Sequence, residues 1–129
     1  MMIEKEKILS KEKIELNPSL FFLYSQLSQL YSLLISPKNF LDEEDYAIGF
    51  SLFGQFQKFN SFCFEISLQI EDFKKASSFL FEEISLLCKI GELRSTVSEK
   101  ERDDQAWAMK AILKLEKGFF FLIFFFNFF

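Results

Sequence analysis

The stretch SFCFEISLQIEDFKKASSFLFEEISLLCKIGEL, residues 61–93, decides the fold class because it fits two different periodicities. In residues 61–71, apolar side chains occupy every second position, as in a half-buried strand. Over the whole stretch, apolar residues also recur at steps of three or four, which is typical of a helix. A single strand cannot pair its own backbone, and the chain has no second alternating run and no Asn-Gly or Asp-Gly turn. The sequence therefore favours a helix, with a strand at residues 61–71 as the alternative.

A leucine repeat lies upstream, between the two prolines of the chain. Asn17 and Pro18 predict a helix start, and Pro37 predicts its end. Between the prolines, leucines follow one another at intervals of 3, 4, 3 and 4, the spacing of a coiled-coil seam: Leu20, Leu23, Leu27, Leu30 and Leu34. Two heptads of this kind more often pack inside a bundle than form a zipper between chains. The repeat predicts a helix with one apolar side, and both uses of that side remain open.

Helix signals are dense again after residue 97. Residues 98–101, SEKE, match a capping box, in which the Ser and Glu side chains bind each other's backbone N–H groups. Lysines gather toward residue 117, and Gly118 stands where a C-terminal cap is expected. Trp107 falls on the apolar side of this segment, as a core anchor or as an interface residue. These signals predict a helix over residues 98–117.

Together, the patterns predict an all-α fold, a small antiparallel helical bundle or a helical hairpin with coiled-coil-like seams. The expected helices lie near residues 18–35, 44–92 and 98–117. Gly49 and Gly54 predict an interruption of the second helix, because a glycine costs a helix about 1 kcal/mol relative to alanine. Residues 1–117 form a single helical interaction module in this interpretation, since 129 residues leave room for one core.

The chain closes with GFFFLIFFFNFF, residues 118–129, in which eight of the twelve residues are Phe. As a helix this tail would cover about 18 Å, well short of the roughly 30 Å hydrocarbon core of a bilayer. One interpretation is the end of a truncated or mis-annotated gene model, because a T-rich non-coding stretch read in frame encodes mainly Phe, Leu and Ile. The other two interpretations are a membrane anchor and a buried core segment.

The chain offers few groups for catalysis. It contains no His, which removes the commonest general base and metal ligand. Glu82 and Glu83 are adjacent on a helix and diverge by about 100°, which favours a solvated face over a substrate site. Cys63 and Cys88 are expected to be reduced core thiols, because their spacing fits neither a zinc site nor a disulfide scaffold. We therefore expect no enzyme activity, no cofactor and no metal site.

The surplus of apolar residues is the main functional signal. Half of the residues are hydrophobic and 20 are Phe, more than a small bundle hides, and exposed apolar surface usually marks an interface. We expect a non-catalytic helical protein–protein interaction or scaffold subunit of an intracellular assembly, which binds other helical proteins or itself. The expected interaction residues are Leu20, Leu23, Leu27, Leu30, Leu34, Phe73, Leu80, Ile84, Leu87 and Trp107.

Charge and the two ends of the chain bear on partners and location. A net charge of −4 provides no basic surface for phosphate backbones, so nucleic acid is not an expected partner. The N-terminal residues contain no uninterrupted apolar stretch, so cytoplasmic localisation is the expectation. The alternative is a membrane-associated protein held by residues 118–129, with Lys110, Lys114 and Lys117 at the lipid headgroups.

Overall fold

The computed structural model describes residues 18–97 and 101–128, and these residues form five helices. The helices are α2 (Pro18–Leu34), α3 (Pro37–Leu41), α4 (Tyr46–Gln69), α5 (Phe73–Val97) and α6 (Glu101–Phe128). The described residues contain no strand, so the predicted all-α class is confirmed and the strand alternative for residues 61–71 is wrong. The caps predicted at Asn17 and Ser98 lie outside the described residues.

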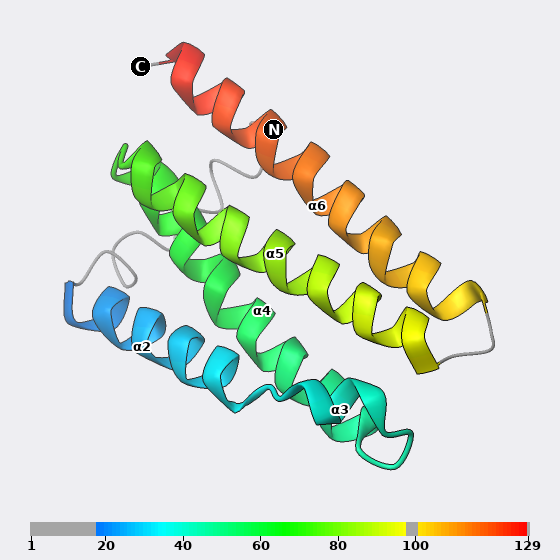
Figure 1. The fold of residues 1–129 in the computed structure, drawn as a ribbon. Coiled ribbons are helices and arrows are strands. Elements are labelled where there is room, and N and C mark those ends of the chain that lie inside the picture. Colours follow the sequence, from blue (N-terminus) through cyan, green and yellow to red (C-terminus); the bar gives the residue numbers. More distant parts are fainter. Residues whose placement is uncertain (1–17, 98–100, 129) are drawn as a thin grey trace.

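The four long helices lie in the order in which they occur along the chain, with α2 and α6 at opposite edges (Figure 1). Neighbouring long helices run in opposite directions, as predicted for an antiparallel bundle (Figure 1). α2 packs on α4, α4 on α5, and α5 on α6. Each outer helix therefore has one side against the bundle and one side away from it.

The short helix α3 was not predicted, because Pro37 was interpreted only as the end of the preceding helix. Pro37 is instead the first residue of α3, where a missing N–H has no consequence. The N-cap is Ser36, whose Oγ accepts a hydrogen bond from Lys38 N (3.2 Å), while Asn39 Oδ1 accepts one from Ser36 N (2.8 Å). This reciprocal cap orients α3 so that Phe40 is fully buried.

The predicted helix 44–92 is two helices, and the break lies at residues 70–72 without glycine or proline. Glu71 adopts a positive φ of 62°, and Asp72 N donates to Ser67 O (2.9 Å) while Glu71 N donates to Leu68 O (3.1 Å). These two bonds make a Schellman C-terminus, which usually has glycine at the left-handed position. Asp72 Oδ1 then accepts a hydrogen bond from Lys75 N (3.1 Å) and caps α5.

The interruption predicted at Gly49–Gly54 does not occur, because both glycines lie inside the continuous helix α4. Gly49 is buried where α3 crosses α4: a Cβ there would lie 2.6 Å from Asn39 Cβ and 3.1 Å from Phe40 Cζ. Gly54 is exposed, and a Cβ there would meet no atom within 4 Å. Only Gly49 is therefore required by a close approach of two helices.

Two apolar clusters form the core. The first comprises the buried residues Phe40, Phe53, Phe56, Leu87, Ile90, Trp107 and Ala111. The second comprises Phe64, Leu68, Ala76 and Leu80. Edge-to-face contacts hold the first cluster together, with ring centroids of Trp107 5.3 Å from Phe53 and 5.8 Å from Phe40.

The predicted helix end at residue 117 is wrong, because α6 continues through Gly118 to Phe128. Gly118 is buried at the crossing of α5 and α6, where a Cβ would overlap the Leu80 side chain. The tail beyond it contributes Phe121, Leu122 and Phe124 to the second cluster. The described part of the Phe-rich tail thus packs on the bundle, and α6 contributes some of its apolar side chains to the core while others remain exposed.

The two glycines of α4 provide a matched pair of substitutions. Gly54→Ala should raise the free energy of unfolding by up to about 1 kcal/mol, because the helix gains propensity in open space. Gly49→Ala should lower it by about 1–3 kcal/mol, because the new Cβ forces α3 away from α4. Urea denaturation of both variants measures the difference, and equal effects at the two positions would contradict the close approach described here.

Candidate interaction surfaces

A layer of polar side chains lies between the two apolar clusters. Its centre is Glu83 of α5, which is fully buried. Lys114 Nζ of α6 lies 3.4 Å from Glu83 Oε2, and Gln57 Nε2 of α4 donates to the same oxygen (3.1 Å). The prediction of a solvated face for the pair Glu82/Glu83 is therefore wrong for Glu83. Its buried carboxylate is compensated by the Lys114 cation and by hydrogen bonds from Gln57 and Asn60.

Asn60 extends this layer from α4 to both neighbouring helices. Its Nδ2 donates to Phe79 O (2.8 Å) and to Glu83 Oε1 (3.4 Å), both on α5. Its Oδ1 accepts a hydrogen bond from Ser28 Oγ of α2 (3.2 Å). Ser28 and Asn60 are both buried. Hydrogen bonds and one ion pair thus connect α2, α4, α5 and α6 through their buried sides.

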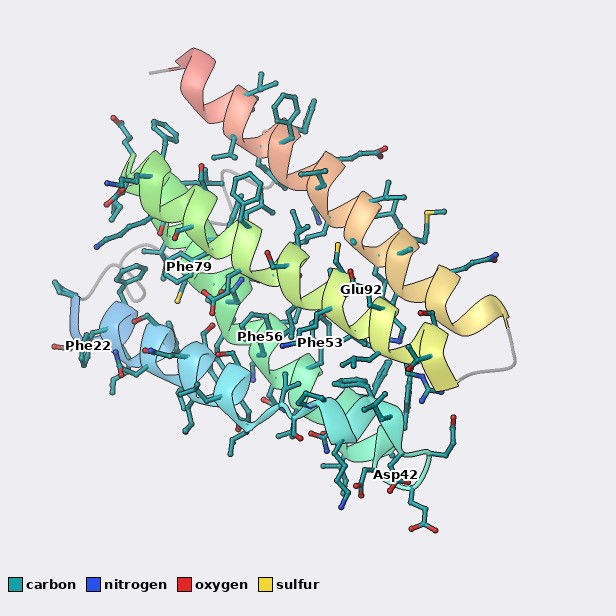
Figure 2. All side chains as sticks on the ribbon, in the orientation of Figure 1. Phe22, Asp42, Phe53, Phe56, Phe79 and Glu92 are labelled. Atoms are coloured by element: carbon teal, nitrogen blue, oxygen red, sulfur yellow. The ribbon has the colours of Figure 1, made fainter. Side chains whose placement is uncertain are left out.

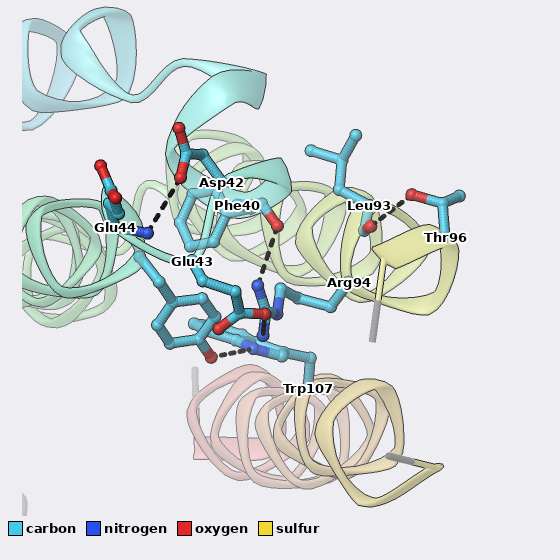
Figure 3. Close-up of polar contacts among 9 residues, drawn as sticks. Phe40, Asp42, Glu43, Glu44, Leu93, Arg94, Thr96 and Trp107 are labelled. Atoms are coloured by element: carbon cyan, nitrogen blue, oxygen red, sulfur yellow. Dashed lines mark hydrogen bonds and ion pairs between the residues drawn. The ribbon is translucent and has the colours of Figure 1, made fainter. Parts of the chain in front are cut away.

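A second buried charge, Arg94 of α5, contacts α3, the turn after it and the start of α4 beside the first apolar cluster (Figure 3). Arg94 Nη1 donates to Phe40 O (3.1 Å), and Arg94 Nη2 lies 3.0 Å from Glu43 Oε1. The guanidinium also lies over the Tyr46 ring, 4.0 Å from its centroid. Trp107 Nε1 donates to Tyr46 Oη (2.9 Å), so the indole is held by a hydrogen bond as well as by packing.

The two cysteines have different surroundings. Cys63 is fully buried, and burial, with a smaller contribution from the Glu82 carboxylate, raises the pKa of its thiol to about 12. Cys88 is exposed, so the prediction of a core thiol is wrong at that position. Because its pKa is raised, the thiol of Cys63 stays protonated, and it is an inert core thiol. Burial also raises the pKa of the neighbouring Glu82 carboxyl above its usual value.

The cavities among the described residues are small for a ligand site. The cavity lined by Ser61, Phe64, Lys114 and Phe121 has a volume of about 110 Å³, and a hollow between α2 and α5 beside Ser28 and Phe79 has a volume of about 210 Å³. Typical ligand sites measure a few hundred Å³ or more. No group of three or more His, Cys, Asp or Glu side chains suited to a metal ion occurs in the part of the chain that the structure describes.

The predicted interaction residues fall into two groups. Leu80, Leu87 and Trp107 are buried in the core, and Phe73 and Ile84 pack against the second cluster. These five residues therefore face the core, four of them from α5 and Trp107 from α6. The five leucines of the α2 repeat lie elsewhere: Leu20 and Leu27 are half-buried, while Leu23, Leu30 and Leu34 are more than half exposed.

The side of α2 that faces the bundle is formed by other residues. Ser28 is buried there, and Tyr24 stacks on Phe62 with ring centroids 5.4 Å apart. Tyr31 stacks on Phe59 at 6.0 Å. These contacts turn the leucine repeat away from α4, so the reading of the repeat as bundle core is wrong for its exposed members.

We call the exposed side of this helix the outer α2 face: Phe22, Leu23, Leu30, Leu33 and Leu34. These side chains are 51–76 % exposed, and at 3.6 residues per turn they fall within an arc of about 120°. Phe22 lies on this side of α2, whereas Phe53 and Phe56 lie between α4 and α5 (Figure 2). The sequence prediction missed Phe22 and Leu33 because neither belongs to the leucine repeat.

The opposite edge carries a second apolar surface, which we call the outer α6 face. It consists of Met109, Ile112, Leu113, Leu115, Phe119, Phe120 and Ile123, which are 43–59 % exposed. Glu116 is exposed within the same arc, and Lys110 and Lys117 are exposed beside it. None of the described helices combines the length and the apolar character that crossing a bilayer requires.

Comparisons with known proteins add no assignment to these surfaces. The sequence matches no family model and no curated protein, and the fold matches no solved structure.

The buried ion pair allows a test of the polar layer. Lys114→Met should lower the free energy of unfolding by about 3 kcal/mol, because the Glu83 carboxylate loses its cation while it stays buried. Adding Glu83→Gln should recover much of this loss. Urea denaturation of the two single variants and the double variant gives the coupling energy. The control is Lys89→Met at an exposed position of α5, which should change stability by less than about 0.5 kcal/mol. A comparable effect of both lysine variants would contradict the role of the pair.

Proposed function

We propose that the chain is a non-catalytic helical interaction subunit that binds another helical protein, or itself, through the outer α2 face. The observation that carries the proposal is the exposure of five large apolar side chains within one arc of α2, three of which are leucines of the repeat. Monomeric soluble proteins rarely leave a contiguous apolar patch of more than a few hundred Å² uncovered.

The geometry of α2 supports this use of its outer face. The bundle side of the helix is already occupied by stacked aromatic rings and by the bond from Ser28 to Asn60. The outer leucines are therefore not required for the fold, and they stand on a helix whose orientation is fixed from behind. A rigid helix that presents an apolar stripe is the usual partner of a second amphipathic helix.

Site-specific photo-crosslinking tests the proposal. A photoreactive phenylalanine analogue in place of Leu30, in the full chain inside cells, should give discrete adducts on irradiation, because position 30 lies in the interface. The matched control places the same analogue at Ala47, an exposed position of α4 outside both apolar faces, and should give no discrete adduct. Equal labelling from the two positions, or none from position 30, would exclude the outer α2 face as an interaction surface.

A second candidate function is association with a membrane surface through the outer α6 face. The observation that favours it is the row of exposed apolar side chains beside Lys110 and Lys117, a combination that suits the boundary of an anionic bilayer. In this arrangement α6 would lie along the surface, with its inner side still packed on α5.

Flotation with vesicles that contain anionic lipid tests the second candidate. Phe120→Glu should reduce the vesicle-bound fraction at least about tenfold, because it adds charge to the side of α6 that enters the lipid. Phe81→Glu is the matched control, since Phe81 on α5 is as exposed as Phe120 but lies outside the outer α6 face. A wild-type chain that stays at the bottom of the gradient would rule this candidate out.

A further inference from the structure

We infer that the occupant of the outer α2 face is a second copy of this chain, in a two-fold contact between the two α2 helices. The inference rests on the proposed function and adds the identity of the partner. It follows from three properties of the face: its lack of charge, its size and its repeat.

The lack of charge favours an identical partner over a charged one. α2 contains no Asp, Glu, Lys or Arg from Pro18 to Leu34, so it offers no charge that a partner of opposite sign could recognise. Charged partners are usually selected by complementary potentials at the interface. A second α2 brings the same uncharged side chains, and no charge is buried when the two faces meet.

The size of the face is sufficient for a small dimer interface. The exposed fractions of the five side chains correspond to roughly 500 Å² of apolar surface per copy, so two copies bury at most about 1,000 Å² of this surface, the lower limit for a specific interface. Two exposed amides add to it, Gln26 within the arc of the face and Gln29 beside it. The expected dimer is therefore one of moderate affinity, which assembles in the micromolar range.

The repeat makes the face self-complementary. In a two-fold contact, the contact of one residue with a second residue of the partner copy occurs twice, once in each direction. The exposed leucines Leu23, Leu30 and Leu34 follow one another at steps of seven and four, so the leucines of one copy can pack between those of the other. Gln26 is the middle residue of the 17-residue helix and is exposed. Its amide carries a donor and an acceptor, so two copies can pair this group across the axis.

Sedimentation equilibrium of the purified full chain over a range of concentrations tests the inference. The wild-type chain should associate to twice its monomer mass of 15.3 kDa. Leu30→Glu should weaken the association by about 100-fold or more, because each dimer then buries two carboxylates in an apolar contact. The matched control is Ile48→Glu, at a residue with 55 % exposure against 51 % for Leu30, and should leave the constant unchanged within about twofold.

A second variant covers the case in which Leu30→Glu disturbs α2. Leu33→Gln keeps a good helix former at a position that is 76 % exposed, and it should also weaken the dimer while circular dichroism stays unchanged. A monomer at about 100 µM, or an assembly that neither α2 variant weakens, would overturn the inference. If the chain is monomeric and position 30 still crosslinks to a different protein in cells, the proposed function stands and only the identical partner is wrong.

Discussion

The arrangement of the long helices depends on the buried carboxylate of Glu83. Gln57 and Asn60 donate hydrogen bonds to it from α4, Lys114 pairs with it from α6, and Asn60 reaches on to Ser28 of α2. We interpret this layer as a determinant of register more than of net stability, since desolvation of a buried ion pair offsets much of its Coulomb attraction. A shift of any of these helices by one turn would leave a buried charge or amide without a partner, and that is more costly than a lost contact.

The contacts between neighbouring helices also decide which apolar residues reach the surface. Where α2 meets α4, a small polar side chain and two tyrosine rings form the contact, so the leucines of α2 are turned outward. Where α6 meets α5, Gly118 allows close approach and only part of the Phe-rich segment fits underneath. Apolar residues therefore remain on the far sides of both edge helices. The excess follows from the composition, because the inner sides of this bundle cannot bury 20 Phe residues together with so many Leu and Ile.

Periodicity was enough to predict the helical class and the α2 helix, because both depend on local spacing in the sequence. The break between α4 and α5 was not predictable from composition, since Glu71 takes a left-handed conformation that usually signals glycine. The glycines led to the opposite error, because Gly49, Gly54 and Gly118 were predicted to interrupt or end helices and none of them does. Two of them, Gly49 and Gly118, instead permit the close approach of two helices. The site was harder to predict than the fold. Which side of a two-sided helix faces the core depends on partners far away in the sequence, as Ser28 and Asn60 show.

The two outer faces differ in chemistry, and this separates their uses. The outer α2 face belongs to a helix without charges, whereas the outer α6 face is interrupted by Glu116 and bordered by Lys110 and Lys117. An uncharged face is suited to its own copy, since nothing is repelled and no charge loses solvent. A face with basic neighbours is better suited to an anionic surface. Because α2 and α6 lie at opposite edges, a two-fold contact through α2 leaves α6 uncovered in both copies (Figure 1). The proposed dimer contact and the proposed membrane contact would therefore use different residues.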